Sequence, residues 1–329
     1  RRPRGGRRAM ILLPLAPSRL ALWMAARLPR AGRAAVRLWA RSYLARPRPQ
    51  HWLFHKLKAD LRVQLRERVP LLGGHALYVD PLDSIGQAIA RGGCYEPETV
   101  EVFRRLVGPG AVVVDAGAHL GQYSVLGAAA VGPGGAVHAF EPDPVTFGRL
   151  RENLALNGAT GVRCNNVALA REPGRATLYL ADIDVSAGNS LARTRHYGGT
   201  ETTVEVTTLD AYAAAADLRR LDLLKADVEG AELPLLEGGA RTIERFRPRL
   251  ILELSVHGAA FGYAAADLVA RLEGWGYHVF RIGPLPLRPY TARADDPVHF
   301  NVLAVHASDL AGCAAAGVLE PAGAAPGAP

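Results

Sequence analysis

Acidic and small residues interrupt a hydrophobic run in the segment VVVDAGAHLGQYS, residues 112–124. Three valines lead to Asp115, and Gly117 and Gly121 follow before a helical pattern begins. Glycine lets the backbone turn sharply and lets a ligand approach without meeting a Cβ atom. A carboxylate at such a junction repels phosphate and attracts positive charge. The segment therefore predicts a binding site for a cationic ligand, with His119 inside it.

Phosphate-binding loops are the main alternative, and neither common pattern is complete here. The dinucleotide fingerprint requires GxGxxG, and His119 stands where its second glycine would be. The sequence also contains no GxxxxGK[ST] phosphate loop. A nicotinamide-dependent oxidoreductase is therefore disfavoured, but it stays an alternative.

A second acid ends the next predicted strand, in the segment HAFEPDP. Glu141 there is positioned to accept both hydroxyls of a ribose in bidentate hydrogen bonds. Together with Asp115, this acid favours an adenosyl ligand that also carries ammonium and sulfonium charges, which is S-adenosylmethionine. Asn165 and Asn166 end the third predicted strand, where an amide can bind an adenine edge. Ordinary turn residues are the alternative for both asparagines.

Candidate catalytic acids concentrate in the segment KADVEGAE, residues 225–232. Transfer of a methyl group to an alcohol is helped by a base that removes the hydroxyl proton. We predict that Asp227 contacts the ligand nearest its methyl group, and that Glu229 is the base or positions the acceptor. An acid at a helix N-terminus can also be merely stabilising. His257, beyond the fifth predicted strand, is a further candidate base, with an exposed loop residue as the alternative.

A metal site would use the same group of acids. Asp227, Glu229 and Glu253 offer the oxygen ligands that Mg²⁺ prefers. No spacing between them is diagnostic, so the sequence alone leads us to predict no metal.

The elements that must position these residues alternate between strand and helix patterns. Strands are predicted at 111–115, 136–140, 162–166, 222–227, 249–254, 277–281 and 299–305, and helices near 119–130, 144–157, 231–246 and 264–275. This alternation predicts an α/β fold, in which a mostly parallel seven-stranded sheet has helices on both faces and an antiparallel last strand. Ligands of such sheets bind at the carboxyl ends of the strands, where the acids would meet.

Composition divides the chain into four parts. Residues 1–50 form an arginine-rich leader, and 51–110 form a lead-in expected to pack on the catalytic domain. The ligand-binding domain spans 111–306, with a β-rich insertion at about 170–207. Residues 307–329 are rich in Ala, Gly and Pro and are predicted to be disordered. We expect the lead-in and the loop of the insertion to help build the acceptor pocket.

The charge of the chain is distributed unevenly. The net charge is +8, but residues 1–50 hold thirteen arginines and no acid, which leaves about −5 on the remainder. An acidic body argues against a large nucleic-acid groove, so no nucleic acid is expected as a partner. An amphipathic basic pattern within residues 19–45 allows weak contact with a membrane surface. A non-catalytic binding protein acting through this leader therefore stays an alternative.

The three cysteines lie far apart and match no zinc-binding pattern. Reduced, structural thiols are typical of the cytoplasm, which is the predicted location.

Several motifs together resemble one family. DAGAHLGQYS, FEPDP, NNVAL, TLD, LLKADVEGAE and PRLILEL occur in the order and spacing of the FkbM-type methyltransferases, and the resemblance covers about residues 80–305. It implies a class I, Rossmann-like methyltransferase fold that uses S-adenosylmethionine. The acceptor it implies is a hydroxyl of a small metabolite, sugar, polysaccharide or polyketide. One difference is His119, because the family usually has Asn at that position.

Overall fold

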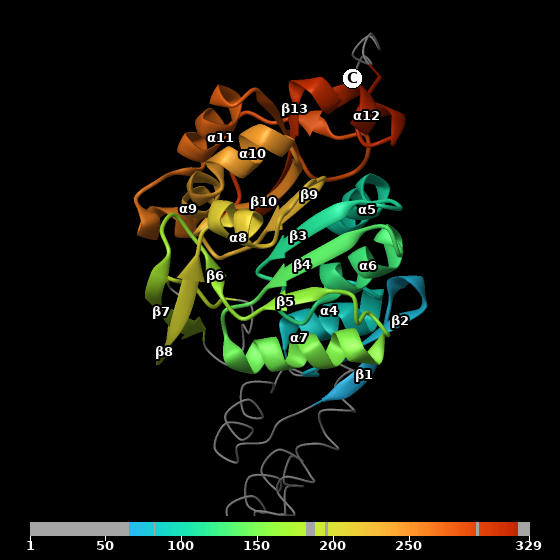
Figure 1. Cartoon of the computed structure of the whole chain (residues 1–329), viewed down its shortest axis with the longest axis vertical. Helices are drawn as coiled ribbons and strands as arrows, with labels where there is room; N and C mark the ends of the chain where they lie inside the picture. The colour runs from blue at the N-terminus through green and yellow to red at the C-terminus, as the bar shows by residue number, and fades with distance from the viewer. Residues whose placement is uncertain (1–65, 82, 182–187, 195–196, 294–295, 322–329) are drawn as a thin grey trace, which may run out of the picture.

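The computed structural model describes residues 66–81, 83–181, 188–194, 197–293 and 296–321. Eight strands form its main sheet: β3 (Val112–Ala116), β4 (Ala136–Phe140), β5 (Arg163–Asn165), β9 (Leu223–Ala226), β10 (Arg249–Ser255), β11 (Tyr277–Arg281), β12 (Arg288–Pro289) and β13 (His299–His306). Their order across the sheet is β12-β11-β13-β10-β9-β3-β4-β5 (Figure 1). Strands β5, β4, β3, β9 and β10 pair in parallel, whereas β13 runs antiparallel to both of its neighbours.

The predicted seven-stranded, mostly parallel sheet with an antiparallel last strand is confirmed, and β12 adds a short eighth strand at the edge. The last strand, β13, pairs with both β11 and β10 and so lies inside the sheet. Its residues 302–305 are completely buried, which explains this position because such an apolar strand requires cover on both faces.

Helices cover both faces of the sheet, as predicted. One hydrophobic core includes Val113 and receives side chains from α4 (Ser84–Gly92), α5 (Pro97–Leu106), α6 (Gln122–Val131) and α7 (Pro144–Leu156). The other core includes Val114 and receives α8 (Leu209–Ala215), α9 (Glu232–Gly238), α10 (Ala240–Phe246) and α11 (Ala265–Gly274). Neighbouring residues of β3 thus face opposite cores, as the pleat of a strand requires.

The single helix predicted near 231–246 is in fact two helices, which meet at Gly239. A Cβ atom at Gly239 would lie 2.8 Å from Leu209 Cδ2, so α8 packs directly against this junction. The break therefore lets α9 and α10 follow the sheet separately.

The insertion forms a small sheet of its own, beside the carboxyl ends of the main strands (Figure 1). Strand β8 (Tyr197–Thr207) lies between β6 (Ala168–Leu169) and β7 (Gly174–Ala181). Three buried side chains from these strands, Ala168, Leu178 and Val204, form its core.

The lead-in includes a β-hairpin that is fastened to α7. Its strands are β1 (Glu67–Leu71) and β2 (His75–Val79). Asn153 of α7 and Asn157 at its C-cap accept hydrogen bonds from the backbone of β2 and donate others to its carbonyls. This bonding keeps the lead-in beside the start of the catalytic domain.

The expectation of disorder after residue 306 is wrong for residues 307–321. They form a short 3₁₀ turn and α12 (Leu310–Ala315), and Leu319 bridges to Leu287. Burial of Cys313 and the ion pair of Asp309 with Arg249 explain this order, because both fasten the segment to the sheet. Residues 322–329, the leader 1–50 and its amphipathic pattern lie outside the described residues.

Within the described part of the chain, no helix combines the length and the hydropathy that crossing a bilayer requires.

Two helical glycines provide a test of how the insertion contacts the main domain. A Cβ at Gly238 would overlap the carbonyl oxygen of Ala170, whereas a Cβ at Gly148 of α7 would meet nothing within 4 Å. We expect Gly238→Ala to lower the free energy of unfolding by about 1–3 kcal/mol through overpacking. Gly148→Ala should raise it by up to about 1 kcal/mol through helix propensity. Urea denaturation measures both, and equal effects would contradict the close contact.

Candidate active site

A cavity lies along the carboxyl ends of five parallel strands. Residues that follow β5, β4, β3 and β9 line it, as does Glu253 of β10. Leu178, Asn189 and Leu191 of the insertion line its other side. The cavity lies at the edge of the sheet where the ligand site is predicted.

The turn after β3 is fixed by close packing on both sides. Gly117 lines the cavity at φ 76°, and a Cβ there would overlap the carbonyl oxygen of Asp227. Gly121 has a φ of 91°, and a Cβ atom added there would lie 2.7 Å from Leu150 Cδ1. Gly121 does not line the cavity. Neighbouring protein atoms thus leave no room for a side chain at either position. Of the two predicted ligand contacts, only that of Gly117 agrees with the cavity lining.

Asp115 is buried and does not line the cavity. Its side chain is buried, and Oδ2 accepts a 2.6 Å hydrogen bond from the Ser124 hydroxyl. Burial raises the pKa of Asp115, and Lys225 and Ser124 partly oppose that shift. We therefore revise the predicted direct contact with the ligand, because the buried carboxylate is bound by Ser124 and is not part of the cavity lining.

Lys225 of β9 stands opposite Asp115 of β3 and forms an ion pair with Asp227, which follows β9. Its Nζ lies 3.1 Å from Asp227 Oδ2 and 4.6 Å from the centroid of the Tyr123 ring. Burial alone lowers the pKa of Lys225, but the carboxylates of Asp227 and Asp115 outweigh this effect and raise it. The ammonium group is therefore charged, and it holds the side chain of Asp227 at the cavity.

Glu141 lies in the cavity wall after β4, as predicted. Its two carboxylate oxygens accept hydrogen bonds from the backbone amides of His119 and Asp143, each 3.0 Å long. Burial raises the pKa of Glu141 to about 8, against the opposing effect of these two bonds. Each oxygen keeps a further lone pair, which suits two hydroxyl donors.

His119 lines the cavity and is part of the same turn. Its φ of 51° lies in the left-handed region, where Asn and His are found more often than most residues. A histidine therefore fits the backbone at a position where the family usually has Asn. Burial lowers the pKa of His119, so its imidazole is neutral at neutral pH.

Asn166 does not line the cavity. It is exposed, and its amide donates to the carbonyl oxygens of Glu141 and Pro142 at 2.8 and 2.9 Å. Its predicted binding role is corrected to that of fixing the turn that presents Glu141. Val167, Ala168 and Leu169 line the cavity in its place, and their apolar side chains carried no recognisable signal in the sequence.

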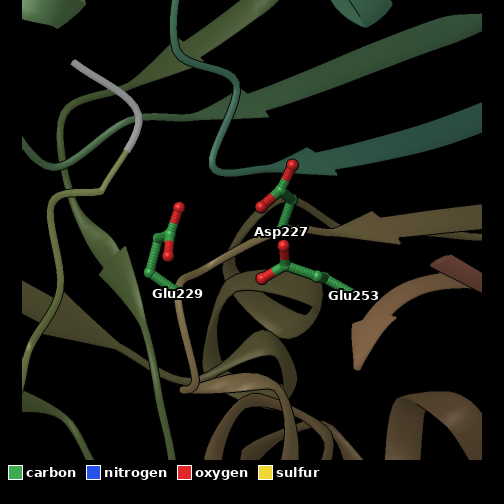
Figure 2. A group of neighbouring side chains, drawn as sticks. All are labelled: Asp227, Glu229 and Glu253. Atoms are coloured by element: carbon green, nitrogen blue, oxygen red, sulfur yellow. The ribbon is translucent and has the colours of Figure 1, made fainter. Parts of the chain in front are cut away.

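Asp227, Glu229 and Glu253, the acid cluster, gather at the other end of the cavity (Figure 2). One oxygen from each carboxylate lies within 4.8 Å of the others. Burial, followed by the charge of Asp227, raises the pKa of Glu229 to about 8. Burial also raises the pKa of Glu253 to about 7, although its contact with His299 opposes the shift. The cluster therefore holds protons that isolated carboxyl groups would release.

Two histidines contact carboxylates of the acid cluster. His257 Nδ1 lies 2.9 Å from Glu229 Oε2, and His299 Nδ1 lies 3.4 Å from Glu253 Oε1. The two rings pack edge to face, with centroids 4.8 Å apart. His257 is buried and outside the cavity lining, so the prediction of a base is revised to orientation of Glu229. His299 was not singled out because only strand pairing brings β13 beside β10.

Glu232 binds the backbone of the loop between β9 and α9. Its buried carboxylate accepts hydrogen bonds from the amides of Val228 and Gly230, at 3.0 and 3.4 Å, and from the Tyr263 hydroxyl at 3.1 Å. Burial raises its pKa to about 8. These bonds support the left-handed backbone of Glu229, which has a φ of 54°.

The lead-in also reaches the cavity. Tyr95 and Glu96 line it, and the Tyr123 hydroxyl donates to Glu96 Oε2 at 3.3 Å. Burial and then Asp227 raise the pKa of Glu96. Neither residue was predicted individually, since Glu96 before Pro97 resembles an ordinary helix start.

Comparisons with known proteins identify the family of this chain. The model of the methyltransferase FkbM domain matches residues 115–279. The chain belongs to the FkbM methyltransferase family. This match begins at the acid of β3 and ends in β11, so it includes every predicted site residue.

Relatives of this FkbM-family chain include both fungal and bacterial proteins. Methyltransferase 1 of Beauveria bassiana is 32% identical over 144 residues, which cover 38% of the chain and only 57% of that relative. The 31-O-demethyl-FK506 methyltransferase FkbM of Streptomyces tacrolimicus is 30% identical over 213 residues, covering 56% of the chain and 78% of that protein. The solved methyltransferase FkbM of Methylobacillus flagellatus has 16% identity and a TM-score of 0.37, covering 81% and 58% of the two chains.

The raised pKa of Glu232 predicts a pH dependence of stability. A group with its pKa raised by folding stabilises the native state fully below its unfolded value, here 4.5, and loses that contribution as pH rises toward 8. We expect Glu232→Gln, which imitates the protonated form, to remove a slope of up to about 1.4 kcal/mol per pH unit between pH 5 and 8. Urea denaturation across this range measures the slope. Glu201→Gln, on an exposed part of β8, should leave it unchanged; a wild-type slope in the Glu232 variant would contradict the assignment.

Proposed function

We propose that this protein is an S-adenosylmethionine-dependent O-methyltransferase that acts on a hydroxyl of a small metabolite, sugar, polysaccharide or polyketide. The observation that carries this proposal is the placement of Glu141 and the acid cluster along one cavity, on opposite sides of β3. Strands in a sheet are about 4.8 Å apart, so Glu141 after β4 and Asp227 after β9 are separated by about 10 Å along the sheet edge. That separation suits a ligand with a ribose at one end and a reacting centre at the other.

The residues in the cavity fit the proposed cofactor. Val167 to Leu169 offer an apolar surface for adenine, and Glu141 offers two acceptors for the ribose hydroxyls. Further along, Glu96 and Asp227 offer negative charge for the ammonium and sulfonium groups. Asp227 stays a proposed cofactor contact, and this is supported by the ion pair with Lys225, which occupies its Oδ2 and leaves Oδ1 for a ligand. When bound, S-adenosylmethionine supplies a methyl group already activated by its sulfonium.

The acid cluster is suited to control the acceptor hydroxyl. In-line attack by that oxygen forms the O–C bond and breaks the S–C bond, whose electron pair stays on sulfur. The hydroxyl proton must leave at the same time. Glu229 either accepts it or positions the hydroxyl, and His257 fixes the carboxylate in the required orientation. A pKa of about 8 gives Glu229 useful basicity near neutral pH.

The named relative supports a natural-product acceptor. The Streptomyces protein is named for methylation of 31-O-demethyl-FK506, which has a hydroxyl oxygen as acceptor. The small-molecule acceptor and the cytoplasmic location of the present chain stay predictions.

Binding of S-adenosylhomocysteine tests the cofactor site. Glu141→Ala removes two charge-assisted acceptors, each worth about 1.5–3 kcal/mol, so affinity should fall by about 100-fold or more. Glu101→Ala, on α5 and outside the cavity lining, removes the same charge and should bind normally. Isothermal titration calorimetry gives both affinities. Unchanged binding in the Glu141 variant would refute this ribose site.

Turnover tests the acid cluster separately. Glu229→Gln and Asp227→Asn should lower the rate of methyl transfer by about 100-fold or more, because proton removal and acceptor alignment are lost. The affinity of Glu229→Gln for S-adenosylhomocysteine should stay within about fivefold of wild type, whereas Asp227→Asn also removes charge from the proposed ammonium site and should bind it more weakly. Methyl-labelled S-adenosylmethionine with a panel of sugar and polyketide alcohols measures the rate. Glu237→Gln, in α9 and outside the cavity, serves as control, and full activity in both cluster variants would exclude them from catalysis.

A further inference from the structure

A buried hydroxyl group joins the insertion to the loop that carries Glu229. Ser190 is only 1% exposed, and its hydroxyl donates a 2.8 Å hydrogen bond to the backbone carbonyl oxygen of Glu229. Ser190 belongs to the insertion, whereas Glu229 follows β9 of the main sheet. The bond is therefore a tertiary contact between the insertion and a residue of the acid cluster.

The carbonyl of Glu229 is part of a peptide group that side chains hold at both polar ends. Ser190 binds the carbonyl oxygen, and the N–H of the same peptide group, on Gly230, donates to Glu232 Oε1 at 3.4 Å. The next carbonyl oxygen, that of Gly230, accepts a 2.8 Å bond from the Tyr263 hydroxyl. Side chains from the insertion, from α9 and from the loop before α11 thus fix the backbone on either side of this peptide group.

The backbone at this position needs such support. Gly230 has a φ of 99°, and a Cβ there would lie 2.7 Å from the backbone carbonyl carbon of His257, so close packing excludes a larger residue. Glycine leaves the chain free to rotate, and the left-handed φ of 54° at Glu229 is unfavourable for a residue with a side chain. Loss of a bond to the peptide group would let Glu229 leave this conformation, and its carboxylate would move.

The segment around Ser190 is held by the insertion. Its backbone exchanges two hydrogen bonds with Tyr179 of β7, at 2.8 and 3.0 Å. Asn189 and Leu191 line the cavity, whereas Ser190 between them does not. Successive side chains of an extended chain point to opposite sides. The segment 189–191 therefore presents two residues to the cavity and one hydroxyl to the loop of Glu229.

We propose that Ser190 is a positioning residue for Glu229. The proposal rests on the proposed function, in which Glu229 accepts the proton of the acceptor hydroxyl or positions that hydroxyl. Because Ser190 lies outside the cavity lining, it acts through Glu229 and not on either reactant. Misplacement of a reacting group by about 1 Å can lower a rate by about 100-fold. The insertion thus contributes to catalysis as well as forming one wall of the cavity.

The pair Ser190→Thr and Ser190→Val separates the hydroxyl bond from packing. The two new side chains have nearly the same shape, so overpacking at this buried position affects both, but only the first can donate a hydrogen bond. We expect kcat for methyl transfer to be at least about tenfold lower in Ser190→Val than in Ser190→Thr. Ser190→Ala, which adds no volume, should lower kcat at least about tenfold below wild type. The KM for S-adenosylmethionine and the affinity for S-adenosylhomocysteine should change less than about threefold in all three variants.

Thr242→Val is the matched control. Thr242 of α10 is buried and outside the cavity lining, and its hydroxyl donates a 2.7 Å hydrogen bond to Asp210 Oδ1. This variant also loses one hydroxyl bond at a buried position, but the bond does not reach the loop of Glu229. Its kcat should stay within about twofold of wild type.

Hydrogen exchange of the full chain measures the same bond without an acceptor. The backbone amides of residues 228–231 should exchange at least about tenfold faster in Ser190→Val than in Ser190→Thr, because the loop opens more often. Thr242→Val should leave this exchange unchanged. Equal exchange in the Thr and Val variants of Ser190 would overturn the proposal, and so would equal kcat values or an equal loss of kcat in Thr242→Val. Absence of S-adenosylhomocysteine binding in the wild type would refute the proposed function, whereas the exchange comparison would still decide whether Ser190 holds Glu229.

Discussion

The buried ammonium group of Lys225 is the interaction on which the site depends. It forms an ion pair with Asp227 at the cavity, and the charge of Asp115 on the neighbouring strand also stabilises it. Asp115 would be costly to bury as an isolated charge, and this ammonium group lowers that cost. Asp115 and Lys225 stand opposite each other in the pairing of β3 with β9, so the attraction acts between the carboxyl ends of these two strands.

Backbone packing also holds the loop that carries the carboxylates after β9. Gly117 packs against the carbonyl of Asp227, and Gly230 packs against the backbone of His257. Glu232 then binds the amides of the loop between them. The left-handed conformation of Glu229 is an unfavourable one for a residue with a side chain, and it persists because these neighbours determine it. A carboxylate held in this way is already oriented before any ligand arrives, which is what alignment of two reactants requires.

The sequence predicted the sheet well because its strands are continuous apolar runs bounded by turns. The expected meeting of Glu141, Asp227 and Glu253 also followed, since parallel strands place their carboxyl ends at one edge. Errors arose where a tertiary contact decides the role of a residue. Asp115 is buried and bound by Ser124, and Asn166 bonds the turn after β4. The order of residues 307–321 depends on a contact with β10, which local composition does not reveal.

The charge of the cavity has a consequence for the order of events in the proposed reaction. Its lining carries five carboxyl groups, Glu96, Glu141, Asp227, Glu229 and Glu253, against the single ammonium of Lys225. The pKa values of Glu96, Glu141, Glu229 and Glu253 are raised because burial separates these groups from water, so they retain protons that isolated carboxyl groups would release. A sulfonium donor offers a positive charge that favours the ionised carboxylates. Methyl transfer converts that sulfonium to a neutral thioether, so the product loses the attraction that the donor had. The same acidic wall that favours binding of the donor therefore also favours release of the spent cofactor.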